Sequence, residues 1–117
     1  MKRARLHPVS IEKLGGLRAN VRSMVLATIE SLQTATGEWT REDRALREPL
    51  TPLRKLPIGE VRIAYGLTEE HVEILDVGFR LAHREDHFYA RLSERIDNGD
   101  YDDVLMEIRA FAAGQPP

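Results

Sequence analysis

The pattern of apolar and polar positions predicts that the chain begins with a strand and continues with two helices. Residues 3–9, "RARLHPV", alternate as a strand that ends near Pro8, because proline has no amide hydrogen to donate to a sheet. Ser10 is expected to cap a short helix that Gly15 and Gly16 end. A longer helix follows, because apolar residues recur at spacings of three and four: Leu17, Val21, Met24, Val25, Thr28, Ile29 and Leu32.

The middle of the chain is polar and then extended. Residues 33–49 are mixed in charge and predict a loop, with a helical turn around residues 42–47. Residues 50–60, "LTPLRKLPIGE", predict a weak strand or an extended arm. Two prolines argue against a central strand there.

Two strands joined by a turn are predicted in residues 61–80, "VRIAYGLTEEHVEILDVGFR". In the first strand, apolar Val61, Ile63 and Tyr65 share one face, and Arg62 lies on the other. The second strand is an almost continuous apolar run, which is typical of a strand covered on both faces.

The last third of the chain predicts two helices. Residues 81–96 place Phe88, Leu92 and Ile96 on one helix face. Asp100 is expected to cap a final acidic helix whose apolar stripe is Tyr101, Val104, Leu105, Ile108 and Phe111. The element order predicts an α+β fold: a small, mostly antiparallel curved sheet, with an N-terminal helix hairpin and C-terminal helices packed against one side.

Composition places this chain among ordinary globular domains. It has 117 residues, 42% of them hydrophobic, and no cysteine, which excludes disulfides, thiolate zinc sites and cysteine nucleophiles. No secretory signal and no membrane span are expected, because residues 24–27 form the longest aliphatic run. We therefore expect a cytoplasmic protein, and no pattern calls for a cofactor.

Charge is distributed unevenly along the chain. Residues 1–62 carry twelve Lys and Arg against seven Asp and Glu, whereas residues 63–117 carry five against twelve. Fourteen of the basic residues are arginine, whose planar fork matches phosphate and carboxylate groups. The asymmetry indicates either a basic surface for an anionic partner or a solvated surface of uneven charge.

Four residues are candidates for chemistry: Lys55, Arg62, Arg80 and Tyr89. If Lys55 and Arg62 point to one face of a curled sheet, Arg80 on a neighbouring strand can lie beside them. Such a cationic face would hold a phosphodiester and stabilise charge growing on phosphorus without a metal. The alternative is that each arginine forms a salt bridge, Arg62 with Glu60 or Glu73 and Arg80 with Asp76 or Glu85.

His83 and His87 lie four residues apart and would share a helix face. Metal ligation there would lack a third ligand, so no metal site is predicted. Proton transfer near neutral pH and an exposed helix face remain open.

The segment "LRKLPIGEVRIAYGLTEEHVEILDVGFR", followed by Tyr89, resembles the RelE/ParE superfamily of bacterial type II toxins, closer to the RelE branch. Its members have an arm of the form L..L..G..RI.Y, a turn, a strand like V.IL.VG.R and a later tyrosine. The resemblance covers about residues 3–92. It implies a toxin domain over residues 1–96 and leaves residues 97–117 as an acidic helical extension packed on the same domain.

The resemblance implies a metal-independent endoribonuclease that cuts messenger RNA on the ribosome and inhibits translation by attack of a ribose 2′-hydroxyl on the adjacent phosphate. Lys55 and Arg62 would be clamp or base, Arg80 would hold the phosphate or protonate the leaving group, and Tyr89 would stack on a base or move a proton. Arg54, His83, Arg84 and His87 are expected to bind substrate.

The resemblance also implies a cognate antitoxin protein. Two other functions stay open: a ParE-like inhibitor of DNA gyrase, and a non-catalytic binding protein of the same fold. The net charge of −2 is unlike the basic character of ribosome-dependent nucleases, which keeps these alternatives in view. Whether the protein forms a homodimer, and whether the acidic last helix covers the basic face, are also open.

Overall fold

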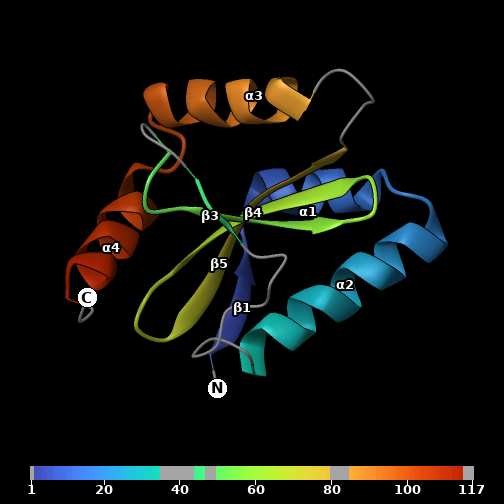
Figure 1. Ribbon diagram of the computed structural model, residues 1–117, viewed down its shortest axis with the longest axis horizontal. Helices are drawn as coiled ribbons and strands as arrows, with labels where there is room; N and C mark the ends of the chain where they lie inside the picture. The colour runs from blue at the N-terminus through green and yellow to red at the C-terminus, as the bar shows by residue number, and fades with distance from the viewer. Residues whose placement is uncertain (1, 35–43, 47–49, 80–84, 115–117) are drawn as a thin grey trace.

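The computed structural model describes residues 2–34, 44–46, 50–79 and 85–114 (Figure 1). Within them the elements run β1 (Arg3–Leu6), α1 (Pro8–Gly15), α2 (Ala19–Thr34), β2 (Arg44–Ala45), β3 (Arg54–Ile58), β4 (Val61–Leu67), β5 (His71–Phe79), α3 (Glu85–Asp97) and α4 (Asp102–Ala113). The strands form one sheet in the order β1-β5-β4-β3-β2, and β1 is parallel to β5 while the other neighbours are antiparallel. The α+β fold with a mostly antiparallel sheet is therefore confirmed.

Helices cover both faces of the sheet rather than the one side predicted (Figure 1). On one face, Ile63 and Tyr65 of β4 pack with Val25 and Ile29 of α2. On the other, core residues of β4 and β5 pack with residues of α3 and α4, among them Ala64, Leu75, Phe88, Leu92 and Leu105. Two helical layers are needed because β5 is apolar on both faces, so that one layer would leave half of it in water.

A β-bulge interrupts the pairing of β4 with β5. Ala64 lies opposite Asp76 and Tyr65 lies opposite Ile74, so Leu75 is an extra residue in β5. Leu75 and Asp76 consequently both turn toward α3 and α4, since Ile74 and Val77 on either side belong to the α2 face. The bulge thus places a charged side chain beneath two helices.

Strand β3 pairs with β4 along its length and with β2 at Arg54 and Lys55, so the predicted extended arm lies inside the sheet. Pro57 is tolerated there because its backbone nitrogen faces the β2 side of the strand and not β4. Leu46 N–H donates to Leu53 O on the β2 side of the strand, and Pro57, four residues on, faces the same side. The missing amide hydrogen therefore faces away from β4 and removes no bond of that ladder.

Several predicted element boundaries are wrong. Helix α1 begins at Pro8, with His7 as N-cap, and Ser10 lies inside it, donating its hydroxyl to the carbonyl oxygens of His7 (2.8 Å) and Ile74 (3.0 Å). Helix α4 begins after Tyr101 and not at a capping Asp100.

Two further details of the sequence prediction are corrected. In α2, Met24 is 46% exposed and lies outside the buried stripe. The predicted helical turn at residues 42–47 contains the short strand β2 instead. Across the parts of the chain that the structure describes, no helix is long and apolar enough to cross a membrane.

The outer edge of β1 is closed by the end of α2. Gln33 accepts a hydrogen bond from Lys2 N–H at its backbone oxygen (3.0 Å) and one from Ala4 N–H at Oε1 (2.8 Å). These two amides alternate along the strand and face away from β5, so a single glutamine satisfies two donors of an edge strand.

Candidate functional site

The structure brings Lys55 and Tyr89 together on the face of the sheet that α3 covers. Lys55 lies opposite Ala64, which is part of the core beneath α3 and α4, so both side chains project to that face. Tyr89 is half-buried on α3, and Lys55 Nζ lies 5.3 Å from the centroid of its ring. This distance is within the range of a cation–π interaction, in which the ring face attracts the ammonium group.

Arg62 projects to the same face as Lys55 and lies close to the β3–β4 turn. The residue is only 6% exposed, and its Nη1 donates to the carbonyl oxygens of Gly59 (2.8 Å) and Val61 (3.0 Å). Gly59 lies in the β3–β4 turn with φ 57°, a conformation that favours glycine, and Val61 is the first residue of β4 after that turn. Arg62 therefore stabilises the turn. Its predicted partner Glu73 bonds to Arg5 and His7 instead.

The remaining predicted site residues divide into two groups. Arg54 lies opposite Tyr65, whose ring is in the core beneath α2, so Arg54 projects to the face opposite Lys55 and is not brought to it. Arg80, His83 and Arg84 lie outside the described residues, and His87 lies in α3 without a described side chain.

Helix α3 approaches β5 closely at the level of this pair. A Cβ atom at Gly78 would lie 2.5 Å from Cδ2 of Phe88, so only glycine leaves room for the ring. The rings of Phe88 and Tyr89 meet edge to face with centroids 5.1 Å apart. The position of Tyr89 over Lys55 is therefore set by how α3 packs on the sheet.

A buried carboxylate that the sequence reasoning assigned only as a partner of Arg62 organises the other end of the sheet. Glu73 is fully buried and accepts bonds from Arg5 Nε (2.9 Å) and Thr68 Oγ1 (3.3 Å), with His7 Nε2 at 2.8 Å. Burial raises the pKa of Glu73, but the hydrogen bonds of Arg5 and His7 outweigh it, and the pKa lies below its usual value. One signal was available in the sequence. Arg5 and His7 lie two residues apart within the predicted first strand, and Glu73 is a charged residue within an apolar run.

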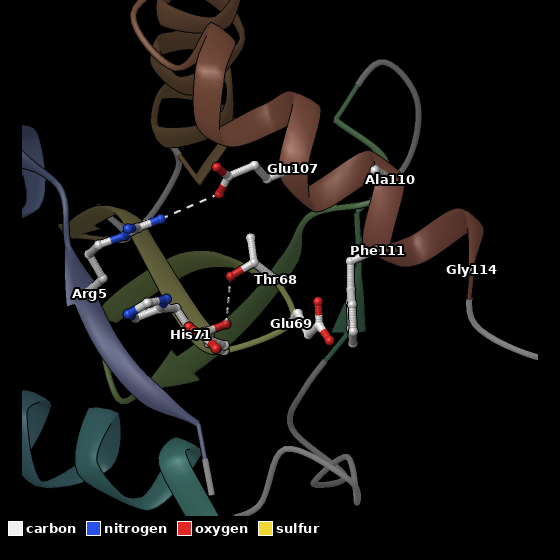
Figure 2. Close-up of a pocket in the computed structure, with 9 residues that line it drawn as sticks. Arg5, Thr68, Glu69, His71, Glu107, Ala110, Phe111 and Gly114 are labelled. Carbon is white, nitrogen blue, oxygen red and sulfur yellow. Dashed lines mark hydrogen bonds and ion pairs between the residues drawn. The ribbon is translucent and has the colours of Figure 1, made fainter.

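Beside this carboxylate, a cavity of about 700 Å³ lies between β1, the β4–β5 turn and the end of α4 (Figure 2). Figure 2 shows Arg5 reaching across the cavity toward Glu107 of α4, with an Nη2–Oε2 distance of 3.5 Å. Two more carboxylates, those of Glu69 and Glu70, line the cavity. Three carboxylates would repel a phosphodiester, so the Lys55–Tyr89 pair and not this cavity is the candidate for RNA chemistry.

Helix α4 packs on the end of the β4–β5 ladder that is nearer the turn between these strands. Ile108 lies against Gly66, where a Cβ atom would come within 2.6 Å of its Cδ1, and Glu107 faces Arg5. Gly66 and Gly78 lie toward opposite ends of the β4–β5 ladder, since Gly66 pairs with Glu73 and Gly78 with Arg62. Among the side chains that the structure describes, no three His, Asp or Glu come together so as to hold a metal ion.

The comparisons with known proteins bear on the fold. No protein-family model and no curated protein matches this chain. Among solved structures, the RelBE2 toxin–antitoxin complex of Mycobacterium tuberculosis contains a chain of similar structure, with a TM-score of 0.60. This chain has the fold of RelE-like toxins. The similarity covers 68% of this chain and 98% of the other, at 21% sequence identity.

A second similar structure is a copper-bound mutant toxin from Helicobacter pylori. Its TM-score is 0.48 at 18% identity, and the similarity covers 68% of this chain and 94% of the other. At these identities the likeness concerns the fold, and the activity has to be argued from the side chains.

Proposed function

We propose that this chain is the toxin of a toxin–antitoxin pair, and that it cleaves messenger RNA on the ribosome by a RelE-like, metal-independent reaction. The observation that carries the proposal is the Lys55–Tyr89 pair, a cation and a phenol held on one face of a RelE-like sheet. It combines the two functions that strand cleavage needs from a protein, positive charge and a group able to move a proton.

In the proposed reaction, the ribose 2′-oxygen gives its proton to a water molecule as it forms a bond to phosphorus, and the bond from phosphorus to the 5′-oxygen breaks. The products are a 2′,3′-cyclic phosphate and a 5′-hydroxyl. Lys55 acts as the cationic clamp, and the ring of Tyr89 holds its ammonium group in place. The Tyr89 hydroxyl is proposed to give a proton to the departing 5′-oxygen, and Arg80, the residue directly after β5, to hold the phosphate.

The proposed partner is a cognate antitoxin protein. The similar Mycobacterium tuberculosis chain was determined as part of a toxin–antitoxin complex, which supports the same kind of partner here. Co-expression with the product of an adjacent reading frame should restore growth if the chain is toxic.

The deciding experiment is induced expression in a bacterium, with growth and messenger-RNA integrity followed together. Wild type is compared with Lys55→Met, Tyr89→Phe and Arg80→Ala, and with the exposed Arg109→Gln as a charge-matched control. We expect growth arrest with RNA ends that carry 2′,3′-cyclic phosphate. Cleavage should fall by roughly 10²–10³-fold in Lys55→Met and stay unchanged in the control.

Two outcomes would refute the proposal. Arrest with intact messenger RNA would indicate another target, with DNA gyrase the first to examine, as for ParE-like toxins. Normal growth with folded, abundant protein would indicate a binding protein that has the fold without the chemistry.

A further inference from the structure

The bulge in β5 directs a fully buried carboxylate toward helices α1 and α3. Asp76 accepts a hydrogen bond from Arg95 Nη1 of α3 at 2.7 Å, and Lys13 Nζ of α1 lies 3.0 Å from its other oxygen. Its Oδ1 also accepts from Val77 N–H at 2.8 Å. From α4, Tyr101 donates its hydroxyl to Leu75 O at 2.9 Å, in the same bulge. One carboxylate with two cationic partners therefore connects β5 to α1 and α3.

Helix α3 is held on the sheet at two points of one face. Phe88 packs into the space left by Gly78, and Arg95 binds Asp76. These helix residues are seven apart, which is two turns, or about 10 Å along the axis. Tyr89 directly follows Phe88 and is therefore rotated about 100° around the helix from the first point. Together with Leu92, which lies between them along the helix and packs in the same core, these contacts hold the rotation of α3 and its height above the sheet.

We propose that Asp76 is a positioning residue for the Lys55–Tyr89 pair: through Arg95 it fixes the rotation of α3 and so holds the Tyr89 ring over the Lys55 ammonium. Its importance for cleavage rests on the function proposed above, but its effect on the geometry does not. Lys13 serves as an internal reference, because it binds the same carboxylate from a different helix; its contact with α3 is the weaker one of its Nζ 5.9 Å from the centroid of the Phe88 ring, which Lys13→Gln removes as well.

The test compares Arg95→Gln with Lys13→Gln, two variants that each remove one cation from Asp76 and differ in which helix they release. The readout is the ring-current shift, the change in the NMR chemical shift of the Lys55 ε-protons that the nearby Tyr89 ring causes. The Tyr89→Leu variant gives the chemical shift without the ring. We expect Arg95→Gln to lose more than half of the ring-current shift and Lys13→Gln to keep it. Arg95→Lys, which restores a cation beside Asp76, should recover part of it.

RNA cleavage is measured on the same variants. We expect a loss of roughly 10–100-fold for Arg95→Gln, since misplacing a group by about 1 Å has effects of that size. A ring-current shift unchanged in Arg95→Gln, or lost equally in Lys13→Gln, overturns the positioning role. If wild type shows the ring-current shift but cleaves no RNA, the proposed function fails and the positioning role stands.

Should Arg95→Gln not fold, the double variant Asp76→Asn, Arg95→Met decides. It removes both charges and leaves Lys13, with its side chain 24% exposed, able to turn to solvent. The ring-current shift should be lost in this variant too, and a wild-type value would overturn the proposal.

Discussion

Substitution of Gly78 by alanine tests the close packing of α3 on β5. The added methyl carbon would lie 2.5 Å from Cδ2 and 3.0 Å from Cε2 of Phe88, well inside van der Waals contact. Phe88 is 4% exposed and is surrounded by core, so the ring cannot swing into solvent. The helix must move outward or the ring must leave its rotamer.

The size of the effect follows from these contacts. Overpacking a core by one methyl group typically costs about 1–3 kcal/mol. Replacing glycine with alanine also restricts the unfolded chain, which returns about 0.4–1 kcal/mol. The middles of these ranges, about 2 and about 0.7 kcal/mol, leave a net loss of about 1.3 kcal/mol of unfolding free energy. For a domain of this size, that lowers Tm by roughly 4–8 °C.

The assay is thermal unfolding followed by circular dichroism, with Gly15→Ala as the control. Gly15 is the last residue of α1 and has nothing within 4 Å of its notional Cβ atom, so alanine there should leave Tm unchanged or raise it. A glycine-to-alanine substitution is thus expected to lower Tm at Gly78 and to leave Tm unchanged or raise it at Gly15. A Gly78→Ala protein with Tm at or above wild type would refute the packing argument.

Three further predictions concern side chains held by hydrogen bonds. In the folded protein the pKa of Glu73 lies below the usual 4.5, so the ionised carboxylate stabilises the fold fully above pH 4.5, and this stabilisation is lost as pH falls through the folded pKa. Glu73→Gln should therefore lower Tm at pH 7 and make Tm depend less on pH in the acidic range. Burial and the charge of Asp76 raise the pKa of Tyr101 to about 12, so this tyrosine lowers stability as pH rises from 10 to 12. Tyr101→Phe should remove that loss and cost about 1 kcal/mol at neutral pH through its bond to the backbone, both measurable by urea unfolding. Gln33→Ala should cost about 0.5–1.5 kcal/mol and speed hydrogen exchange at the amide of Ala4, and an unchanged exchange rate would contradict the edge-closing role.

The sequence was most informative where a pattern is local and repeated. The alternation of residues 61–65 correctly assigned the two faces of β4, and the near-continuous apolar run correctly indicated a strand covered on both sides. The stripe of Phe88, Leu92 and Ile96 correctly identified the buried face of α3. In each case the side chains on one face of a strand or helix meet the same core, so the spacing of apolar residues along the sequence indicates which of them are buried.

It was least informative where a contact spans the chain. The alternation of apolar and polar residues gave no sign of the bulge, because an extra residue in β5 can be recognised only from the pairing of β5 with β4. Arg62 also illustrates the limit: its place on the sheet face follows from alternation, but its bonds to the turn carbonyls depend on the conformation of Gly59. Lys55 and Tyr89 lie 34 positions apart, and their pairing depends on the packing of α3 against Gly78.

The parallel pairing of β1 with β5 has a consequence for synthesis on the ribosome. Arg3 of β1 pairs with His71 of β5, so nearly seventy further residues are synthesised after β1 before β5 is available to pair with it. At about 5–20 residues per second, this interval is roughly 3–14 s. Helix α2 is complete by Thr34, and Gln33 can close the outer edge of β1 early. The nascent strand then has one open side instead of two, which halves the backbone it offers to neighbouring chains until β5 arrives.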